Sequence, residues 1–316
     1  MKPQLANDAN LATLVYPVGV QVKIDGVRAL NINGTLTGRS LDPFKGFGVT
    51  EYWSRAYFKG LDGEMTLGDN PASTDRLCSL TTGAMGAFKG ITETSNLHWW
   101  VFDDLTNPAD PYSVRYARLK VRVANLEHPR VHLVPLHIAN NREELDALIA
   151  RFFDEGYEGA IIRNLDAPAK EGRPSKVKQE LVRVKGWADA EVIVTGITEG
   201  RTNTNEAKTN TLGHTERSSA KEGMIPNGMV GSIQGRLLAD IVHSQGAILK
   251  GTEVTIATGS MTNLEADFYW KNPDKIVGCV VKFAYMTHGI KDLPRFPVYM
   301  SHRLLEDMSD GKESQN

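Results

Sequence analysis

The clearest hydrophobic pattern in the chain has a helical period and runs from Arg142 to Glu155. Its apolar residues recur at i, i+3, i+4, i+7 and i+8, which places them on one face of an α-helix. These residues are Leu145, Leu148, Ile149, Phe152 and Phe153. We expect Asn141 to cap the start of this helix and Gly156 to end it in a left-handed conformation.

Short strands and one further helix are predicted for the rest of the first half. The segment from Val18 to Leu30 has the pattern of a strand, a tight turn and a second strand. Trp99 to Phe102 is a short apolar run bounded by acids, typical of a buried strand end. Pro111 to Leu126 is predicted to be helical, with Asp110 as its cap and Pro111 at its first position. This mixture predicts an α+β fold.

The character of the chain changes after Trp187, where short strands follow one another at irregular spacing. Such a series predicts a small β-barrel, with a short helix from Asn263 to Trp270 between two of its strands. We therefore place a domain boundary near Gly186, giving domains 1–186 and 187–316. The predicted strands are Glu191–Ile197, Met229–Leu238, Glu253–Ala257, Val277–Tyr285 and Val298–Met300.

One segment, Thr198 to Gly228, interrupts the barrel pattern. It is rich in Thr, Asn, Glu, Lys and Gly and contains almost no large apolar residues. Because such a stretch buries too little surface to order itself, we expect a long mobile loop inserted between barrel strands. Two interpretations stay open: a tolerated surface insertion, or a clamp that orders on a nucleic acid.

Composition narrows the class of protein only modestly. The chain has 316 residues, 41% of them hydrophobic, and a net charge of -2. No apolar run is long enough to span a bilayer, and the first ten residues lack a signal pattern, so we expect no membrane association and a cytoplasmic location. The two distant cysteines, Cys78 and Cys279, argue against a zinc or disulfide framework and are predicted to be core side chains.

Positive charge is concentrated locally despite the negative total. Between Arg163 and Lys185, seven basic residues face only three acidic ones. A protein that grips DNA usually presents such a basic face, because the release of counterions supplies much of the affinity. By itself, the run is more typical of a solvated charged loop, and it is the flanking motifs that favour a binding face.

The segment Lys23-Ile24-Asp25-Gly26-Val27-Arg28 carries the strongest sign of chemistry. A lysine is an ammonium ion in water, and it becomes a nucleophile only when its surroundings favour the free amine. Gly26 allows a tight turn and a close approach of the backbone to a ligand. Arg28 offers a rigid fork of donors that suits phosphate or ribose oxygens.

Further short motifs follow this hexapeptide in a particular order, and the set resembles the ATP-dependent DNA ligases, within the covalent lysyl-nucleotidyltransferase superfamily. The order and spacing cover nearly the whole chain. The motifs are Gly38-Arg39-Ser40, Leu61-Asp62-Gly63-Glu64, Val101-Phe102-Asp103-Asp104-Leu105, Glu158-Gly159-Ala160-Ile161-Ile162-Arg163, Leu181-Val182-Arg183-Val184-Lys185-Gly186-Trp187 and Arg295-Phe296-Pro297. The resemblance implies an adenylation domain of antiparallel sheets with helices, followed by an OB-fold.

The resemblance also implies how the first chemical step is performed. Lys23 attacks the α-phosphate of ATP and forms lysyl-AMP, and Asp25 orients the amine. Arg183 and Lys185 alternate along one strand and so face one side, where they flank the α-phosphate. The family more often has lysine where this chain has Arg183, so its contact is expected to differ.

The remaining cofactor-binding residues are assigned by the same resemblance. Phe102 stacks on adenine, Gln21 reads the edge of that base, and Glu64 accepts a hydrogen bond from the ribose. Glu158 binds a divalent metal, Mg²⁺ or Mn²⁺, directly or through water; a single carboxylate that acts with phosphates is usual for Mg²⁺. Arg295 orients the pyrophosphate leaving group.

For the DNA substrate, Arg28 and Arg39 are expected to hold the 5'-phosphate at a nick. Arg28 is also a candidate contact for the nucleotide sugar. The resemblance implies a monomer that seals nicks in duplex DNA in replication, repair or recombination. With only about twenty residues before Lys23, the chain resembles a minimal two-domain ligase such as those of bacteriophages, so the location is the host cytoplasm if it comes from a phage.

Three alternatives remain at this point. RNA ligases and capping guanylyltransferases belong to the same superfamily and share parts of the lysine motif. The sequence Glu158-Gly159 argues against capping enzymes, which more often have Asp-Gly there. A barrel-like second half argues against RNA ligases. A non-catalytic nucleic-acid-binding protein built on an OB-fold is the third alternative, and it would have no need of Lys23.

Overall fold

A computed structural model describes residues 2–72, 77–86, 96–243 and 246–303 of the chain. The chain separates into two compact units. The first comprises Met1–Lys185 together with Asn210–His214, and the second comprises Gly186–Thr209 and Thr215–Asn316. The division between Lys185 and Gly186 lies one residue from the predicted domain boundary.

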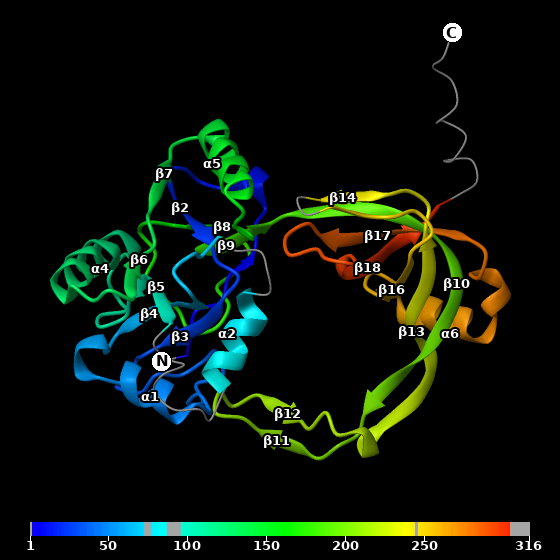
Figure 1. The fold of residues 1–316 in the computed structure, drawn as a ribbon, viewed down its shortest axis with the longest axis horizontal. Coiled ribbons are helices and arrows are strands. Elements are labelled where there is room, and N and C mark those ends of the chain that lie inside the picture. Colours follow the sequence, from blue (N-terminus) through cyan, green and yellow to red (C-terminus); the bar gives the residue numbers. More distant parts are fainter. Residues whose placement is uncertain (1, 73–76, 87–95, 244–245, 304–316) are drawn as a thin grey trace, which may run out of the picture. The chain divides into compact units, whose positions relative to one another are not determined.

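The first unit contains two sheets (Figure 1). The five-stranded sheet has the order β1-β9-β8-β2-β7, and the four-stranded sheet has the order β3-β4-β5-β6. Their strands are β1 (Asn7–Asp8), β2 (Val18–Lys23), β3 (Val27–Leu30), β4 (Leu61–Leu67), β5 (Leu97–Asp104), β6 (Val131–Leu133), β7 (His137–Ala139), β8 (Gly159–Arg163) and β9 (Leu181–Lys185). The sheets are mainly antiparallel as predicted, but each contains one parallel pair, β1–β9 in the first and β5–β6 in the second.

The predicted strand, turn and strand between Val18 and Leu30 are present, but they do not form a hairpin. Strands β2 and β3 belong to different sheets, and the turn from Ile24 to Gly26 carries the chain from one to the other. A Cβ atom added to Gly26 would lie 2.2 Å from the carbonyl oxygen of Met65. Glycine is therefore required here by close packing of the backbone.

In the described part of this unit, four α-helices pack on these sheets: α1 (Phe47–Trp53), α2 (Leu77–Gly86), α4 (Tyr112–Leu126) and α5 (Arg142–Asp154). Helix α5 confirms its periodicity, since Leu145, Ile149 and Phe152 are buried. The Asn141 side chain accepts a hydrogen bond from the Glu144 amide as predicted, and Gly156 has a φ of 88°.

The predicted start of α4 is wrong in detail. Pro111 occupies the cap position with an extended ψ of 149°, and no side chain caps the helix. The Asp110 carboxylate instead accepts a hydrogen bond from Arg118 at 2.6 Å. An arginine two turns into the helix therefore attracts the side chain that the sequence pattern assigned to the helix terminus.

Strands of the second unit close into a barrel with the order β10-β13-β16-β18-β17. Its elements are β10 (Trp187–Asn203), β11 (Ala207–Thr209), β12 (Thr215–Arg217), β13 (Met224–Leu237), β14 (Ile241–His243), β15 (Gly246–Ile248), β16 (Glu253–Ala257), α6 (Asn263–Lys271), β17 (Val280–Met286) and β18 (Arg295–His302). All five predicted barrel strands and the predicted helix are present. Strands β10 and β13 are much longer than predicted.

The prediction of a loop without structure from Thr198 to Gly228 is wrong. Strands β10 and β13 continue into this segment as far as the pair Asn203 and Met224, and β11 then pairs with β12. The side chains of β11 and β12 are exposed. Two paired strands satisfy each other's backbone groups without a core, a possibility that the lack of apolar residues did not reveal.

The helices and the two cysteines bear on two further predictions. None of the helices in the described ranges has the length and apolar character needed to cross a membrane. Within the described residues, Cys78 and Cys279 form no disulfide, and both are only partly buried, so their assignment to the core is wrong.

Candidate active site

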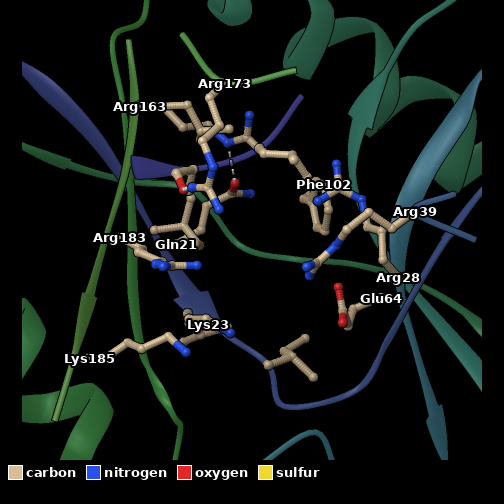
Figure 2. A pocket seen from close by; sticks show the side chains of 16 residues that line it. Gln21, Lys23, Arg28, Arg39, Glu64, Phe102, Arg163, Arg173, Arg183 and Lys185 are labelled. Atoms are coloured by element: carbon tan, nitrogen blue, oxygen red, sulfur yellow. Dashed lines mark hydrogen bonds between the residues drawn. The ribbon is translucent and has the colours of Figure 1, made fainter. Parts of the chain in front are cut away.

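A pocket of about 240 Å³ lies in the first unit, between residues of its two sheets (Figure 2). Figure 2 shows Lys23 and Lys185 on one side of it, and Glu64, Arg28 and Arg39 on the other. Seven of its lining residues are lysines or arginines, and one is acidic. The lining residues are Leu5, Ala6, Gln21, Val22, Lys23, Ile24, Arg28, Arg39, Glu64, Phe102, Ile161, Arg163, Arg173, Leu181, Arg183 and Lys185.

Strand register brings the two predicted catalytic lysines to one place. Lys23 ends β2, Lys185 ends β9, and both are paired with Gly159 on the strand between them. Glu158 directly precedes Gly159, and its amide donates to the carbonyl oxygen of Lys23. The Cβ of any other residue at 159 would lie 2.0 Å from the carbonyl oxygen of Val184, which explains the glycine.

The buried Glu158 carboxylate joins these lysines. One oxygen contacts the Lys23 amine, and the other lies 2.9 Å from the Lys185 amine. Burial alone would raise the pKa of Glu158, but Lys23 and Lys185 together lower it below its usual value. The carboxylate is thus held ionised between two cations at the end of the five-stranded sheet.

Arg28 lines the pocket but is already bound within the protein. Its Nε and Nη2 atoms donate to the two carboxylate oxygens of Asp62 at 2.6 and 2.7 Å. Its guanidinium also lies over the ring of Phe102, 4.7 Å from the ring centroid. A bidentate pair of this kind fixes the plane of an arginine. A contact between Arg28 and a ligand would therefore be made by a guanidinium whose orientation Asp62 sets.

Gln21 lines the pocket and is held in a buried network of hydrogen bonds. Its amide nitrogen donates to the carbonyl oxygen of Val134 at 3.2 Å. Its amide oxygen accepts hydrogen bonds from the Tyr112 hydroxyl at 2.9 Å and from Arg163 Nε at 3.0 Å. The second amide hydrogen of Gln21 therefore remains available to form a hydrogen bond with a base.

Arg163 is a pocket residue to which the sequence motifs assigned no individual role. Its guanidinium stacks over Tyr112 at 4.3 Å and over Phe102 at 5.2 Å. It also lies 3.5 Å from Asp103, which forms a bidentate pair with the buried Arg115. The signal was present in the sequence, since Arg163 ends the Glu-Gly-x-x-x-Arg motif.

Arg173 and the segment Leu5–Ala6 also line the pocket without having been predicted. Arg173 belongs to the basic run that the sequence shows between Arg163 and Lys185. That run alone does not tell which of its members face the pocket. Leu5 and Ala6 could not be recognised as pocket residues from their side chains, because the path of the backbone brings them to the pocket.

Three predicted residues are absent from the described lining of the pocket: Glu158, Asp25 and Arg295. Glu158 nevertheless contacts the amine of Lys23, which lines the pocket. Asp25 lies in the turn after β2 and is partly buried. Arg295 begins β18 in the second unit, where it donates to the carbonyl oxygen of His288 at 3.3 Å. The orienting role of Asp25 and the pyrophosphate role of Arg295 stay predictions.

The donor set limits how a metal ion would be held. Within the described ranges, no group of three or more His, Cys, Asp or Glu residues is placed to bind one. Glu158 is a single buried carboxylate beside a cationic pocket. Such a carboxylate suits Mg²⁺, which keeps several waters and takes its other ligands from substrate phosphates. The residues therefore fit a metal that arrives with a phosphorylated ligand.

Glu64 is expected to make the stability of the free protein depend on pH. Burial raises its pKa to about 7, although Arg28 and Lys23 oppose the shift. Because this folded-state pKa exceeds the usual 4.5, the stabilisation is full below pH about 4.5 and is lost as the pH rises through about 7. Glu64→Gln stays neutral, so it should become more stable than the wild type by at most about 3 kcal/mol at alkaline pH.

Unfolding by urea at about pH 4.5, 6 and 8 measures this effect. We expect the two proteins to be similar at the lowest pH and to diverge as the pH rises. A difference in unfolding free energy that is constant across this range would contradict the raised pKa of Glu64.

The chain was compared with known proteins by sequence. The model of the family described as ATP dependent DNA ligase domain matches residues 3–185. DNA ligases of African swine fever virus, from the isolates Tick/South Africa/Pretoriuskop Pr4/1996 and Warthog/Namibia/Wart80/1980, are each 30% identical over 146 residues. These matches cover 45% of this chain but only 32% of each viral protein, so the chain spans about a third of the curated relatives it matches.

Solved structures resemble the whole described fold. A structure from a study of Lig E DNA ligases has a TM-score of 0.68 at 18% identity, and covers 96% of this chain and 99% of its own. The Chlorella virus DNA ligase-adenylate has a TM-score of 0.50 at 24% identity, again with 96% and 99% covered. At these identities the likeness concerns the fold, and it extends through both units.

Proposed function

We infer that this chain, which belongs to the ATP-dependent DNA ligase domain family, uses ATP to seal nicks in duplex DNA. The observation that carries this inference is the placement of Lys23. Its amine lies at a cationic pocket, in contact with Glu158, with Lys185 on the same carboxylate. A lysine held in this way at a site for phosphates is arranged for nucleotidyl transfer.

In the first step, the free amine of Lys23 forms a bond with the α-phosphorus of ATP. The bond to pyrophosphate breaks, pyrophosphate leaves, and the amine loses its proton to solvent. The contact with Glu158 holds the amine at the end of β2 before attack. Lys185 and Arg183 offset the negative charge of the transferring phosphate. Both line the pocket from β9, as the alternation of their positions predicted.

The nucleoside would be bound by the opposite part of the pocket. Phe102 offers its ring for stacking on adenine, and two arginines already lie against that ring. Glu64 faces the pocket as an acceptor for a ribose hydroxyl. A metal ion would be held by Glu158 together with the phosphates, and would supply positive charge to the reacting phosphate.

The second and third steps take place on DNA. AMP passes from Lys23 to the 5'-phosphate at the nick, and the adjacent 3'-hydroxyl then attacks that phosphate and expels AMP. Arg39 lines the pocket and is the residue we assign to the 5'-phosphate. Arg28 is bound to Asp62, so we assign it an indirect role through Phe102. Each step is a displacement at phosphorus, which positioning and charge stabilisation accelerate.

We assign an OB-fold to the second unit. The closed five-stranded barrel supports this, as does α6, which follows the third barrel strand and precedes the fourth. A monomeric state and a location in the cytoplasm stay predictions.

The test of this function is the sealing of a 5'-phosphorylated nick in duplex DNA with ATP and Mg²⁺. We expect the nicked strand to be converted to a longer product, and we expect no product when the 5'-phosphate is absent. A protein that takes GMP from GTP instead would contradict the proposal and favour a capping enzyme. Joining of nicked RNA alone would favour an RNA ligase.

The hairpin that extends the barrel is expected to bind DNA. Residues 204–223 follow the last paired position of β10 and precede that of β13, so a short Gly-Ser turn can replace them without shortening the barrel ladder. We expect this deletion to weaken binding to a nick about tenfold, because it removes Lys208, Arg217 and Lys221, which would contact backbone phosphates in the clamp. Lysine adenylylation should persist.

Binding of labelled nicked duplex and formation of the protein–AMP adduct are measured on the same preparations. An adduct that forms normally shows that the deletion leaves the first unit folded. Equal nick affinity before and after the deletion would rule out a clamp.

A further inference from the structure

Three arginines of the pocket share a feature outside the motifs. Each donates to a residue of the N-terminal segment Gln4–Asp8, and the accepting residues alternate. Arg28 Nη2 lies 3.5 Å from the carbonyl oxygen of Gln4, and Arg173 Nη1 lies 2.6 Å from that of Ala6. Arg183 Nε lies 2.7 Å from a carboxylate oxygen of Asp8. One extended segment therefore touches cations from three separate parts of the first unit.

The segment is fixed in place by its backbone. The Leu5 amide donates to Gly172 at 2.8 Å, and the Gly172 amide donates to Pro3 at 3.1 Å. The buried Asn7 donates to the carbonyl oxygen of Pro174 at 2.8 Å. Strand β1 pairs in parallel with β9, which sets Asp8 beside Arg183. The segment is thus part of the pocket wall, as the presence of Leu5 and Ala6 in the lining also shows.

The pair between Asp8 and Arg183 does little for the stability of the fold. The Asp8 side chain is 81% exposed and that of Arg183 28%. Exposed pairs of this kind typically contribute less than about 1 kcal/mol. Such a pair has a larger effect on the orientation of the arginine side chain, because a guanidinium is planar and its donors are fixed relative to one another. A carboxylate on Nε orients the plane whose Nη groups meet a bound phosphate.

We propose that Asp8 is a positioning residue that orients Arg183 toward the phosphates of the nucleotide, and that the segment Gln4–Asp8 aligns the pocket arginines as a set. The inference rests on the proposed function, because it concerns the transfer of AMP to Lys23. The pair with Asp8 also accounts for the arginine at position 183, where the family more often has lysine. Arginine, unlike the commoner lysine, has an Nε that a neighbouring carboxylate can hold while its terminal groups face the pocket.

The test is the single-turnover rate of lysyl-AMP formation as a function of ATP concentration. Asp8→Ala should lower the rate at saturating ATP about tenfold and change the unfolding midpoint little. Asp8→Asn, which keeps a hydrogen-bond acceptor, should recover most of the rate. The matched control is Asp146→Ala, which removes another exposed carboxylate from its pair with Arg142 on α5 and should leave the rate unchanged.

Salt and a second substitution separate positioning from a general structural role. Because an exposed pair is screened by ions, the difference between Asp8→Ala and the wild type should shrink between about 50 mM and about 500 mM salt. In an Arg183→Ala background, Asp8→Ala should have no further effect, since there is no guanidinium left to orient.

Equal saturating rates for Asp8→Ala and the wild type at low salt would overturn the inference while leaving the proposed function intact. So would a loss that persists in the Arg183→Ala background, or one that Asp146→Ala reproduces. A wild-type protein that forms no lysyl-AMP at all would instead overturn the proposed function, and with it the transfer step that Asp8 is proposed to assist.

Discussion

Lys23→Ala is expected to abolish both formation of lysyl-AMP and sealing of a nick, with a loss of at least about 10⁴-fold. The reason is chemical, because the first step needs an amine at this position and alanine has none. The other lysine at the site, Lys185, is paired with the second carboxylate oxygen of Glu158. We assign it to charge stabilisation and expect it to take no AMP.

Two controls separate loss of the nucleophile from loss of the ion pair. Lys23→Arg keeps a positive charge for Glu158, so its loss of activity should be as large as that of Lys23→Ala. DNA that already carries AMP on its 5'-phosphate bypasses the lysine, so both variants should still seal it. Nick sealing by Lys23→Ala with ATP would contradict the assignment of the nucleophile.

Asp103→Ala is expected to destabilise the first unit by about 3 to 5 kcal/mol. Asp103 is 2% exposed and Arg115 is 1% exposed. Arg115 donates to both carboxylate oxygens at 2.8 and 3.1 Å, and Arg163 lies 3.5 Å away. Removing the carboxylate leaves buried positive charge without its partner, which is the costly way to break such a pair.

The same substitution should weaken ATP binding, because Arg163 contacts Gln21 and the ring of Phe102. Urea unfolding and nucleotide titration measure the two effects. Asp103→Asn keeps a hydrogen-bond acceptor and should lose about half as much stability. The exposed pair removed by Asp146→Ala should cost less than about 1 kcal/mol. Similar losses for Asp103→Ala and Asp146→Ala would contradict the account of this network.

The sequence predicted the positions of helices and strands better than it predicted which strands pair with one another. Helix α5 follows from the spacing of Leu145, Ile149 and Phe152, since that spacing and the cap lie within one short segment. Strands β2 and β3 were also located correctly. Their placement in different sheets depends on pairing with β8 and β4, far along the chain. No local pattern records such pairing.

The site shows the same division between residue types and their surroundings. Eight of the predicted site residues line the pocket, and Glu158 contacts two of the lysines. The motifs did not reveal that Asp62 holds Arg28, or that Gln21 is committed to Arg163 and Tyr112. These hydrogen bonds and ion pairs join side chains that meet only after folding. They decide which polar groups remain available to a ligand.

The central claim is that Lys23 becomes covalently bound to AMP. The most direct measurement is the mass of the intact protein after incubation with ATP and Mg²⁺, followed by peptide mapping. We expect a mass increase of one adenylyl group (AMP less one water), carried by the peptide that contains Lys23 and removed by added pyrophosphate. An unchanged mass, or AMP on a residue other than Lys23, would contradict it.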